Sequence, residues 1–438
     1  MTRKLPFLVC LLTFLASFLA AQPAPLPSEP QDAELKYVVY LSRHGVRSPT
    51  EQPARYNIYS AAPWPAWDVP PGYLTAHGFK LMEIFGAYDR MELASQGLLP
   101  ATGCTNADRV TFYADSDQRT RETGKALAAG LFPGCAISVR ALPEGTHDPL
   151  FHPTPAGAVR GDSSVAAAAI AGRIGGNPNN LTEAYRPQLT ALDNLLATCG
   201  VAASTQKKRI SLFDIPATLS TGTEDHLAQL RGPLNTASTL TENLLLEYTQ
   251  GMDTANVGWG CVDGARLRSL IDLHTGASDF AHRTPAIARM QATNLLSQIR
   301  GALEQAATGK PVQGALGKPS DRVLFLVGHD TNLSNIAGLL NLTWIADGRR
   351  DDTPPGSALV FELWRTPKTA SYFVRTYFTS QTLEQMRSAS PLSKENLPQR
   401  VPVFIPGCGN ADLACAWPSF VQTIDGAIDP RAISPGAK

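Results

Sequence analysis

Three segments of the chain repeat one arrangement: a short apolar run, a polar loop, and then apolar residues at helical spacing. The runs cover residues 36–41, 109–114 and 323–327, and β-branched and aromatic side chains dominate them. Runs of this length and composition predict β-strands. Leu127 and Leu131 after the second run, and the apolar residues between 333 and 340 after the third, are spaced as on one face of a helix. The pattern therefore predicts three strand–loop–helix units.

Strands that are apolar throughout are typical of a parallel sheet covered by helices on both faces. We therefore predict an α/β fold with a mostly parallel sheet flanked by helices. Between about residues 150 and 265 helical faces replace the strand pattern, for example at 165–171 and 240–248. This stretch predicts a smaller, mainly α-helical inserted domain. The expected divisions are a signal peptide over 1–21, an extended leader over 22–32, a discontinuous α/β domain over 33–149 and 266–430, and the helical insertion over 150–265.

The N-terminus has the pattern of an export signal. Arg3 and Lys4 precede an apolar run from 5 to 21, and small residues end that run. We predict cleavage after Ala21 and export to the periplasm or the medium. A transmembrane anchor is the alternative, but a run of this length is marginal for a bilayer span, and no later stretch of the sequence is longer.

Charge and cysteine content narrow the class of function. The 438 residues include 38 basic and 38 acidic side chains, so the chain offers no bulk charge to nucleic acid or to a membrane surface. After Cys10 leaves with the signal, six cysteines remain, and an even number in an exported chain favours disulfides over metal binding. Counting leaves many pairings open, but proximity in the sequence suggests Cys104–Cys135 and Cys408–Cys415, with Cys199 and Cys261 as a third candidate pair.

The most informative segment is RHGVRSP at 43–49, directly after the first predicted strand. Arg43 and Arg47 flank His44, and arginine binds phosphate oxygens through its planar fork. Nearby positive charge lowers the pKa of an imidazole, so His44 can stay neutral and nucleophilic in acid. Asp330 follows the third predicted strand and opens a helix, where it can protonate a leaving alkoxide. This scheme needs no metal and no cofactor, because the arginines supply the positive charge.

The argument depends on the three strand ends together, since one Arg-His pair is usually part of a solvated loop. The carboxyl ends of parallel strands meet at one edge of a sheet, so the polar residues after each strand should converge there. A second His-Asp pair, at 147–148, precedes a proline and follows no predicted strand, so we expect a structural role for it. The sequence contains no nucleophile elbow, zincin motif, Walker A loop or dinucleotide fingerprint.

RHGVRSP together with GHDTN at 328–332 resembles the histidine acid phosphatase family, most closely its bacterial periplasmic acid phosphatases and phytases. The segments DSDQRTRETG at 115–124, DPLF at 148–151 and TPPG at 353–356 are also similar, so the likeness covers nearly all of the mature chain. The resemblance implies the phosphoglycerate-mutase-like fold of that family and a phosphoric monoester hydrolase that forms a phosphohistidine. It also implies pairing of cysteines 104 with 135 and 408 with 415. The implied site consists of His44 as nucleophile, Asp330 as proton donor, Arg43, Arg47, Arg119 and His329 as phosphate ligands, and Asp115, Thr50 and Thr331 as supporting residues.

The sequence departs from the family where substrate choice is concerned. Phytases of this type usually have a basic residue just after the first motif, where this chain has Glu51, and often a second arginine where it has Gln291. We therefore expect a monomeric acid phosphatase of broad scope on small phosphate esters, which hydrolyses phytate (myo-inositol hexakisphosphate) without strongly preferring it. A phytase proper and a glucose-1-phosphatase are the alternatives, and Gly45 and Thr331 are closer to the phytases.

Two further alternatives are less consistent with the sequence. A phosphoglycerate-mutase-like phosphotransferase would share the Arg-His-Gly histidine, but the signal peptide, the six cysteines and the RSP extension argue against it. An exported phosphate-binding protein without turnover would share the arginines. It would not need a nucleophile beside a proton donor, and the sequence offers both.

Overall fold

The computed structural model describes residues 32–202, 208–222 and 226–433. The chain from Asp32 onward forms one compact unit. The predicted signal peptide, and the leader up to residue 31, lie outside the described residues. Within the described part of the chain, no helix combines the length and apolarity that crossing a bilayer requires.

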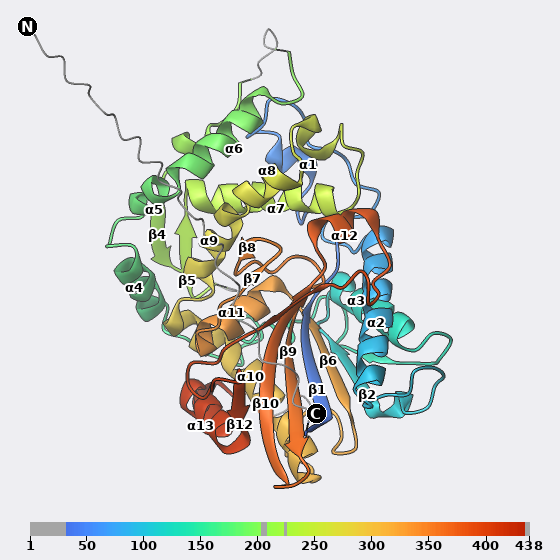
Figure 1. The fold of residues 1–438 in the computed structure, drawn as a ribbon. Coiled ribbons are helices and arrows are strands. Elements are labelled where there is room, and N and C mark those ends of the chain that lie inside the picture. Colours follow the sequence, from blue (N-terminus) through green and yellow to red (C-terminus); the bar gives the residue numbers. More distant parts are fainter. Residues whose placement is uncertain (1–31, 203–207, 223–225, 434–438) are drawn as a thin grey trace, which may run out of the picture. The chain divides into compact units, whose positions relative to one another are not determined.

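A single large sheet lies at the centre of the fold (Figure 1). Its strands follow the order β11-β10-β9-β1-β6-β2-β3, and β12 pairs with β10. The pairs from β1 through β6 and β2 to β3 are parallel, whereas β9 to β12 pair antiparallel on the other side of β1. The strands are β1 (Glu34–Arg43), β2 (Val110–Ala114), β3 (Val139–Arg140), β6 (Val323–Gly328), β9 (Ala358–Thr366), β10 (Ser371–Ser380), β11 (Gln399–Pro402) and β12 (Ala414–Ala416).

The three strands predicted from the sequence are present as β1, β2 and β6, and they are neighbours in the sheet. The predicted α/β fold, with helices flanking a sheet whose parallel strands carry the motifs, is confirmed. The antiparallel strands β9 and β10 are an addition that the sequence pattern did not predict. They extend the sheet beyond β1, so that β1 becomes an interior strand rather than an edge.

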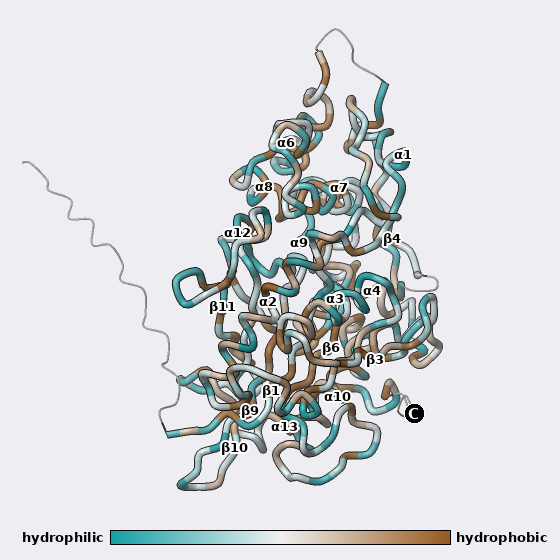
Figure 2. The backbone as a smooth tube through the Cα atoms, turned by 90° about the vertical axis from the view of Figure 1, so that its right-hand side faces the viewer, coloured by the Kyte–Doolittle hydropathy of each residue, from teal (hydrophilic) through white to brown (hydrophobic). Residues whose placement is uncertain are grey.

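Both faces of the sheet are buried, which explains why its central strands are apolar throughout. Val39 and Leu41 of β1 pack in one core, and Val38 and Tyr40 pack in another on the opposite face. On that second face the rings of Tyr40 and Phe325 stack with their centroids 4.5 Å apart. In Figure 2 the backbone around the β6 label is coloured brown, for hydrophobic residues, and every residue of β6 is buried. The first face is covered by α10 (Pro285–Thr308), α11 (Asp330–Leu340) and α13 (Trp417–Ala427), and the second by α2 (Ala76–Ser95) and α3 (Gln118–Leu131).

A layer of helices with its own apolar core lies beyond the carboxyl ends of the parallel strands (Figure 1). Helices are present where the sequence predicted them between 150 and 265, but the core of this layer also includes Val46, Tyr56, Leu267 and Met386 from outside that range. The domain boundaries therefore remain a prediction. The elements of this layer are α1 (Pro53–Tyr56), α4 (Ser163–Arg173), α5 (Asn179–Ala184), α6 (Arg186–Thr198), α7 (Pro233–Thr249), α8 (Gly264–Leu270), α9 (Asp272–Ala281), α12 (Leu383–Ser388), and β4 (Thr218–Thr221) with β5 (Ala228–Arg231). The short pair β7 (Ile345–Ala346) and β8 (Arg349–Arg350) contributes Ala346 to the core on the first face of the sheet.

Three disulfides connect the six cysteines that follow the predicted signal. The bonded pairs are Cys104–Cys135, Cys199–Cys261 and Cys408–Cys415, with Cα atoms 5.7, 6.2 and 5.1 Å apart. All three pairs are those that the sequence favoured, including the third pair, for which proximity gave the weakest argument.

Candidate active site

The ends of β1, β6 and β2 meet at one edge of the sheet and bring three loops together. Arg43 at the end of β1 is the Cα partner of Gly328, and Ala114 at the end of β2 is the partner of Val327. The next residues continue this pairing, because the backbone N–H of His44 donates to the carbonyl of Gly328 at 3.0 Å. The loops that carry the predicted site residues are therefore adjacent, as the topology requires.

His44 lies at the centre of these loops with 1% of its surface exposed. Its Nδ1 is 2.9 Å from the carbonyl oxygen of Gly45. A carbonyl can only accept, so Nδ1 carries the proton and Nε2 keeps its lone pair. Burial, followed by the charges of Arg119, Arg43 and Arg47, holds the pKa of His44 well below its usual range. The imidazole is thus neutral, with one nitrogen available as a nucleophile.

Arg43 and Arg47 converge on a carboxylate of the helical layer. Nη2 of each guanidinium donates to Oε1 of Glu242 in α7, at 3.1 Å for Arg47. Nη1 of Arg43 also donates to the carbonyl of Thr353 at 2.6 Å. Burial would raise the pKa of Glu242, but Arg47 and Arg43 lower it below its usual value. An ionised carboxylate therefore lies between the two arginines, where each could also bind the oxygens of another anion.

Arg119, in the first turn of α3, brings a third guanidinium to the site. Its Nη2 is 2.6 Å from Oδ2 of Asp117 and 3.4 Å from Nδ1 of His329. The buried Nε atoms of Arg43, Arg47 and Arg119 have no hydrogen-bond partner among the described residues. Buried donors without acceptors are rare in folded proteins. Three of them around one imidazole indicate a site for an anion.

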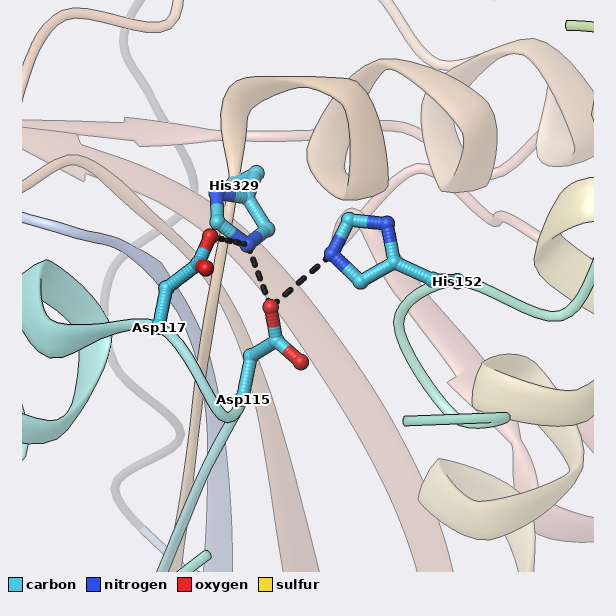
Figure 3. A group of neighbouring side chains, drawn as sticks. All are labelled: Asp115, Asp117, His152 and His329. Atoms are coloured by element: carbon cyan, nitrogen blue, oxygen red, sulfur yellow. Dashed lines mark hydrogen bonds and ion pairs between the residues drawn. The ribbon is translucent and has the colours of Figure 1, made fainter. Parts of the chain in front are cut away.

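His329 ends the loop after β6, and Asp115 holds it in place (Figure 3). Nε2 of His329 donates to Oδ2 of Asp115 at 2.6 Å, and Nε2 of His152 is 2.9 Å from the same oxygen. Burial would raise the pKa of Asp115, but the hydrogen bonds from both imidazoles lower it below its usual value. Burial and the charge of Arg119 lower the pKa of His329, which the Asp115 carboxylate opposes. Nδ1 of His329 is left facing Arg119 and the anion site.

Asp330 opens α11 and faces the arginines from the other side. Its Oδ2 lies 3.5 Å from Nη2 of Arg43 and 3.8 Å from Nε2 of His274 in α9. Burial would raise the pKa of Asp330, but Arg43, His274 and His44 hold it well below its usual range. The carboxyl group of the free protein is therefore ionised. Its side chain is 23% exposed, so a ligand can reach it.

The two supporting threonines lie at the margin of the site. Thr50 is exposed. Its nearest landmark is Gly72: a Cβ atom at that glycine would lie 3.9 Å from Cγ2 of Thr50 and 3.5 Å from Nη1 of Arg119. Thr50 and Arg119 therefore both lie beside Gly72. The backbone N–H of Thr331 donates to Oδ1 of Asp330 at 2.9 Å. Thr331 thus orients the carboxyl group through its main chain.

The second His-Asp pair has the structural position that the sequence suggested. The carboxylate of Asp148 is buried and accepts hydrogen bonds from the Tyr113 hydroxyl and from the backbone N–H of Leu150, both at 2.8 Å. His147 is exposed. The contacts of Asp148 and His147 are with residues other than the three arginines of the site.

Four residues of the site were not assigned a role by the sequence argument: Glu242, His274, His152, and Asp117, which pairs with Arg119. Glu242 and His274 come from helices of the helical layer, and neither belongs to a strand-end loop. His152 follows the DPLF segment and reaches Asp115 from a fourth loop. Glu242 gave no signal in the sequence, because it lies two residues from Leu240 and from Leu244 and is therefore not on the apolar helical face that they form.

The chain has clear relatives among characterised proteins. A sequence profile described as the histidine phosphatase superfamily (branch 2) matches residues 34–379. The chain is 37% identical over 435 residues to the phytase AppA of Escherichia coli (strain K12), covering 97% of this chain and 98% of the relative. It is 30% identical to the glucose-1-phosphatase of Salmonella typhimurium, covering 86% and 89%. The structure of Hafnia alvei phytase in complex with tartrate matches with a TM-score of 0.84 at 35% identity, covering 92% of this chain and 100% of that one.

Proposed function

Because the chain belongs to the histidine phosphatase superfamily (branch 2), we propose that it hydrolyses phosphate monoesters with His44 as nucleophile and Asp330 as proton donor. The superfamily and its phytase and glucose-1-phosphatase relatives make it a phosphoric monoester hydrolase. One observation carries the assignment of roles. A buried, neutral imidazole whose Nε2 keeps its lone pair lies among three guanidinium groups, and their Nε donors have no acceptor in the described part of the chain.

In the first step, Nε2 of His44 attacks phosphorus in line with the ester oxygen. The N–P bond forms as the P–O bond breaks, and the leaving alkoxide takes a proton from the Asp330 carboxyl group. Arg43, Arg47 and Arg119 stabilise the charge on the equatorial oxygens, and Glu242 gives up its contacts with the arginines. His329 donates from Nδ1 to the phosphoryl group once it is protonated, since Asp115 holds its Nε2 proton.

In the second step, a water molecule attacks the phosphohistidine. Asp330, now ionised, removes the proton from that water, and His44 leaves as the neutral imidazole. Phosphate is released and the arginines return to Glu242. The two steps use one carboxyl group first as acid and then as base, so no metal is required by the chemistry.

The direct test is to trap the intermediate. The enzyme is mixed with labelled substrate and quenched in alkali, where phosphohistidine survives, and the adduct is mapped by mass spectrometry. We expect label on His44, and essentially no turnover or label in His44→Ala. His147→Ala, which changes an exposed histidine, is the matched control and should retain both. Substantial turnover by His44→Ala would refute the mechanism.

The substrate class follows from the residues outside the phosphate site. The phosphoryl group is the only part of the ester that the arginines and His329 contact, so simple monoesters should be accepted broadly. We propose that phytate is among the substrates but is not strongly preferred, because Glu51 places negative charge beside Thr50 at the margin of the site. A phytase proper is the second candidate, which the similarity to the E. coli and Hafnia alvei phytases favours.

The three disulfides are consistent with an oxidising compartment. We therefore propose that the protein is exported and cleaved after Ala21, and that it acts as a monomer. The N-terminal sequence of the mature protein and its mass in solution test these two points.

A further inference from the structure

Four side chains beside His44 form a compact set of metal-ligand atoms (Figure 3). Asp115, Asp117, His152 and His329 each offer one donor atom, and the four atoms lie within 4.8 Å of one another. The closest distances are 2.6 Å and 2.9 Å from Oδ2 of Asp115 to Nε2 of His329 and of His152. Oδ2 of Asp117 lies 3.6 Å from Nε2 of His329.

The donor set fits one class of ion. Two imidazole nitrogens and two carboxylate oxygens suit zinc and similar transition metals, whereas calcium and magnesium take more ligands and prefer oxygen alone. Donors about 2.0–2.2 Å from a tetrahedral zinc ion are roughly 3.3–3.6 Å from one another. Two of the measured distances lie below that range and the third lies at its upper limit, so the two imidazoles must move slightly away from Asp115 to admit the ion.

Asp115 gives a second, independent indication. Its side chain has no exposed surface, one carboxylate oxygen is shared by two imidazoles, and the other has no hydrogen-bond partner among the described residues. To become ligands, both imidazoles lose the Nε2 protons that they donate to Oδ2, and the carboxylate can then bind the ion through either of its oxygens. His152 also has its side chain 30% exposed, so an ion can reach the cluster from solvent.

We propose that Asp115, Asp117, His152 and His329 bind a zinc-like divalent transition-metal ion, and that the bound ion inhibits phosphoryl transfer. The inhibitory effect rests on the proposed function. Nη2 of Arg119 now pairs with Asp117 at 2.6 Å, and His329 lies next to it. The ion takes Asp117 and His329 as ligands and repels the guanidinium group. Both proposed phosphate ligands, Arg119 and His329, then leave their working positions.

The test uses the mature enzyme without an affinity tag, treated with EDTA and desalted. Zinc chloride binding is measured by calorimetry, and cobalt chloride binding by the visible absorption of four-coordinate Co²⁺. Initial rates with p-nitrophenyl phosphate are then recorded at increasing zinc concentration. The variants are His152→Gln and Asp117→Asn, and the matched control is His226→Gln, which changes an exposed histidine outside the cluster.

We expect one equivalent of zinc per chain and inhibition at the concentration at which it binds. His152→Gln and Asp117→Asn should each weaken zinc binding at least about tenfold, since removing even a residue that supports a ligand has an effect of that size. Their inhibition constants, each taken relative to the variant's own rate without zinc, should rise by the same factor. His226→Gln should bind zinc and be inhibited like the unmodified enzyme.

Three results would overturn the proposal. They are the absence of zinc binding at submillimolar concentration, unchanged affinity in both variants, and stoichiometric binding that leaves the rate unaffected. Failure of the proposed function gives a different result, because the EDTA-treated enzyme would then not hydrolyse p-nitrophenyl phosphate before any zinc is added. The calorimetric and Co²⁺ measurements would still report the site.

Discussion

Replacing Glu51 by lysine tests whether charge at the margin of the site sets the preference among phosphate esters. Glu51 follows Thr50, which lies beside Gly72, as Arg119 does. Its side chain is 59% exposed, and its carboxylate is 4.0 Å from Nε of Arg55. It is therefore a solvated group that does not hold the phosphate-binding arginines. A change at this position alters the charge met by the rest of the substrate and leaves the reacting phosphoryl group untouched.

The size of the effect follows from the exposure of the side chain. Solvated charge contacts contribute up to about 1 kcal/mol each. Glu51→Lys removes one unfavourable contact with a second phosphate and adds one favourable contact, a change of roughly 1–2 kcal/mol. Taking about 1.4 kcal/mol per tenfold, kcat/KM for phytate should rise about tenfold. p-Nitrophenyl phosphate has no second phosphate, so its kcat/KM should change less than about twofold, and the gain with phytate should shrink in high salt.

The assay measures kcat/KM for both substrates at low and high ionic strength. Glu183→Lys in α5 is the matched control, because Glu183 is also exposed, at 61% of its side chain, and also pairs with a nearby arginine. The control should leave both values unchanged. Equal increases on both substrates would refute the reasoning. So would an unmodified enzyme that already favours phytate by about a hundredfold, although the mechanism would stand.

Three further outcomes follow from the site. Asp330→Asn should slow the hydrolysis of an alkyl phosphate by about 10²–10⁴-fold and affect p-nitrophenyl phosphate less, because p-nitrophenolate leaves without a proton; equal losses on both would contradict its role as acid. Asp330 is ionised in the free protein, so the proton for the leaving group must arrive with the monoanionic form of the substrate. A monoester loses its last proton at about pH 6, and kcat/KM should therefore fall above that pH. A profile that stays flat to neutral pH would contradict this. Glu242→Gln should lower the inhibition constant of inorganic phosphate several-fold, because the carboxylate no longer competes for the two arginines it contacts; weaker inhibition would show that Glu242 orders those arginines instead.

The sequence pattern predicted the strands that are apolar on both faces. It did not predict the strands that carry buried charges, which are stabilised by partners on neighbouring strands. β1, β2 and β6 could be predicted because the helices on either side require apolar residues at every position. β9 and β10 carry Glu362 and Arg375 in their buried stretches. Glu362 is tolerated because Arg400 of β11 donates to its carboxylate at 2.6 Å and the indole N–H of Trp364 at 3.0 Å. Those partners are known only once the sheet has formed.

The same distinction separates the predicted from the missed residues of the site. His44, Asp115 and His329 directly follow strands, and the parallel pairing of those strands forces them together. Glu242 and His274 reach the site because α7 and α9 pack over it. The way in which helices pack cannot be read from the residue type at one position of the sequence. The local sequence pattern therefore identifies the site residues that the sheet positions. Tertiary packing adds Glu242 and His274, which pair with the charged groups among them.

The arginines favour the reactive form of His44 but disfavour the reactive form of Asp330. Arg43 and Arg47 lower the pKa of His44, which keeps the nucleophile neutral, and they also lower the pKa of Asp330, which removes the proton that the leaving group needs. A bound phosphate resolves this conflict. Its negative charge offsets the arginines and raises the pKa of Asp330, while His44 stays neutral because burial is the largest cause of its low pKa. A monoanionic ester also brings the proton that Asp330 lacks in the free protein. The substrate thus supplies both the charge and the proton that make Asp330 an acid, which is why the rate should depend on the protonation of the substrate.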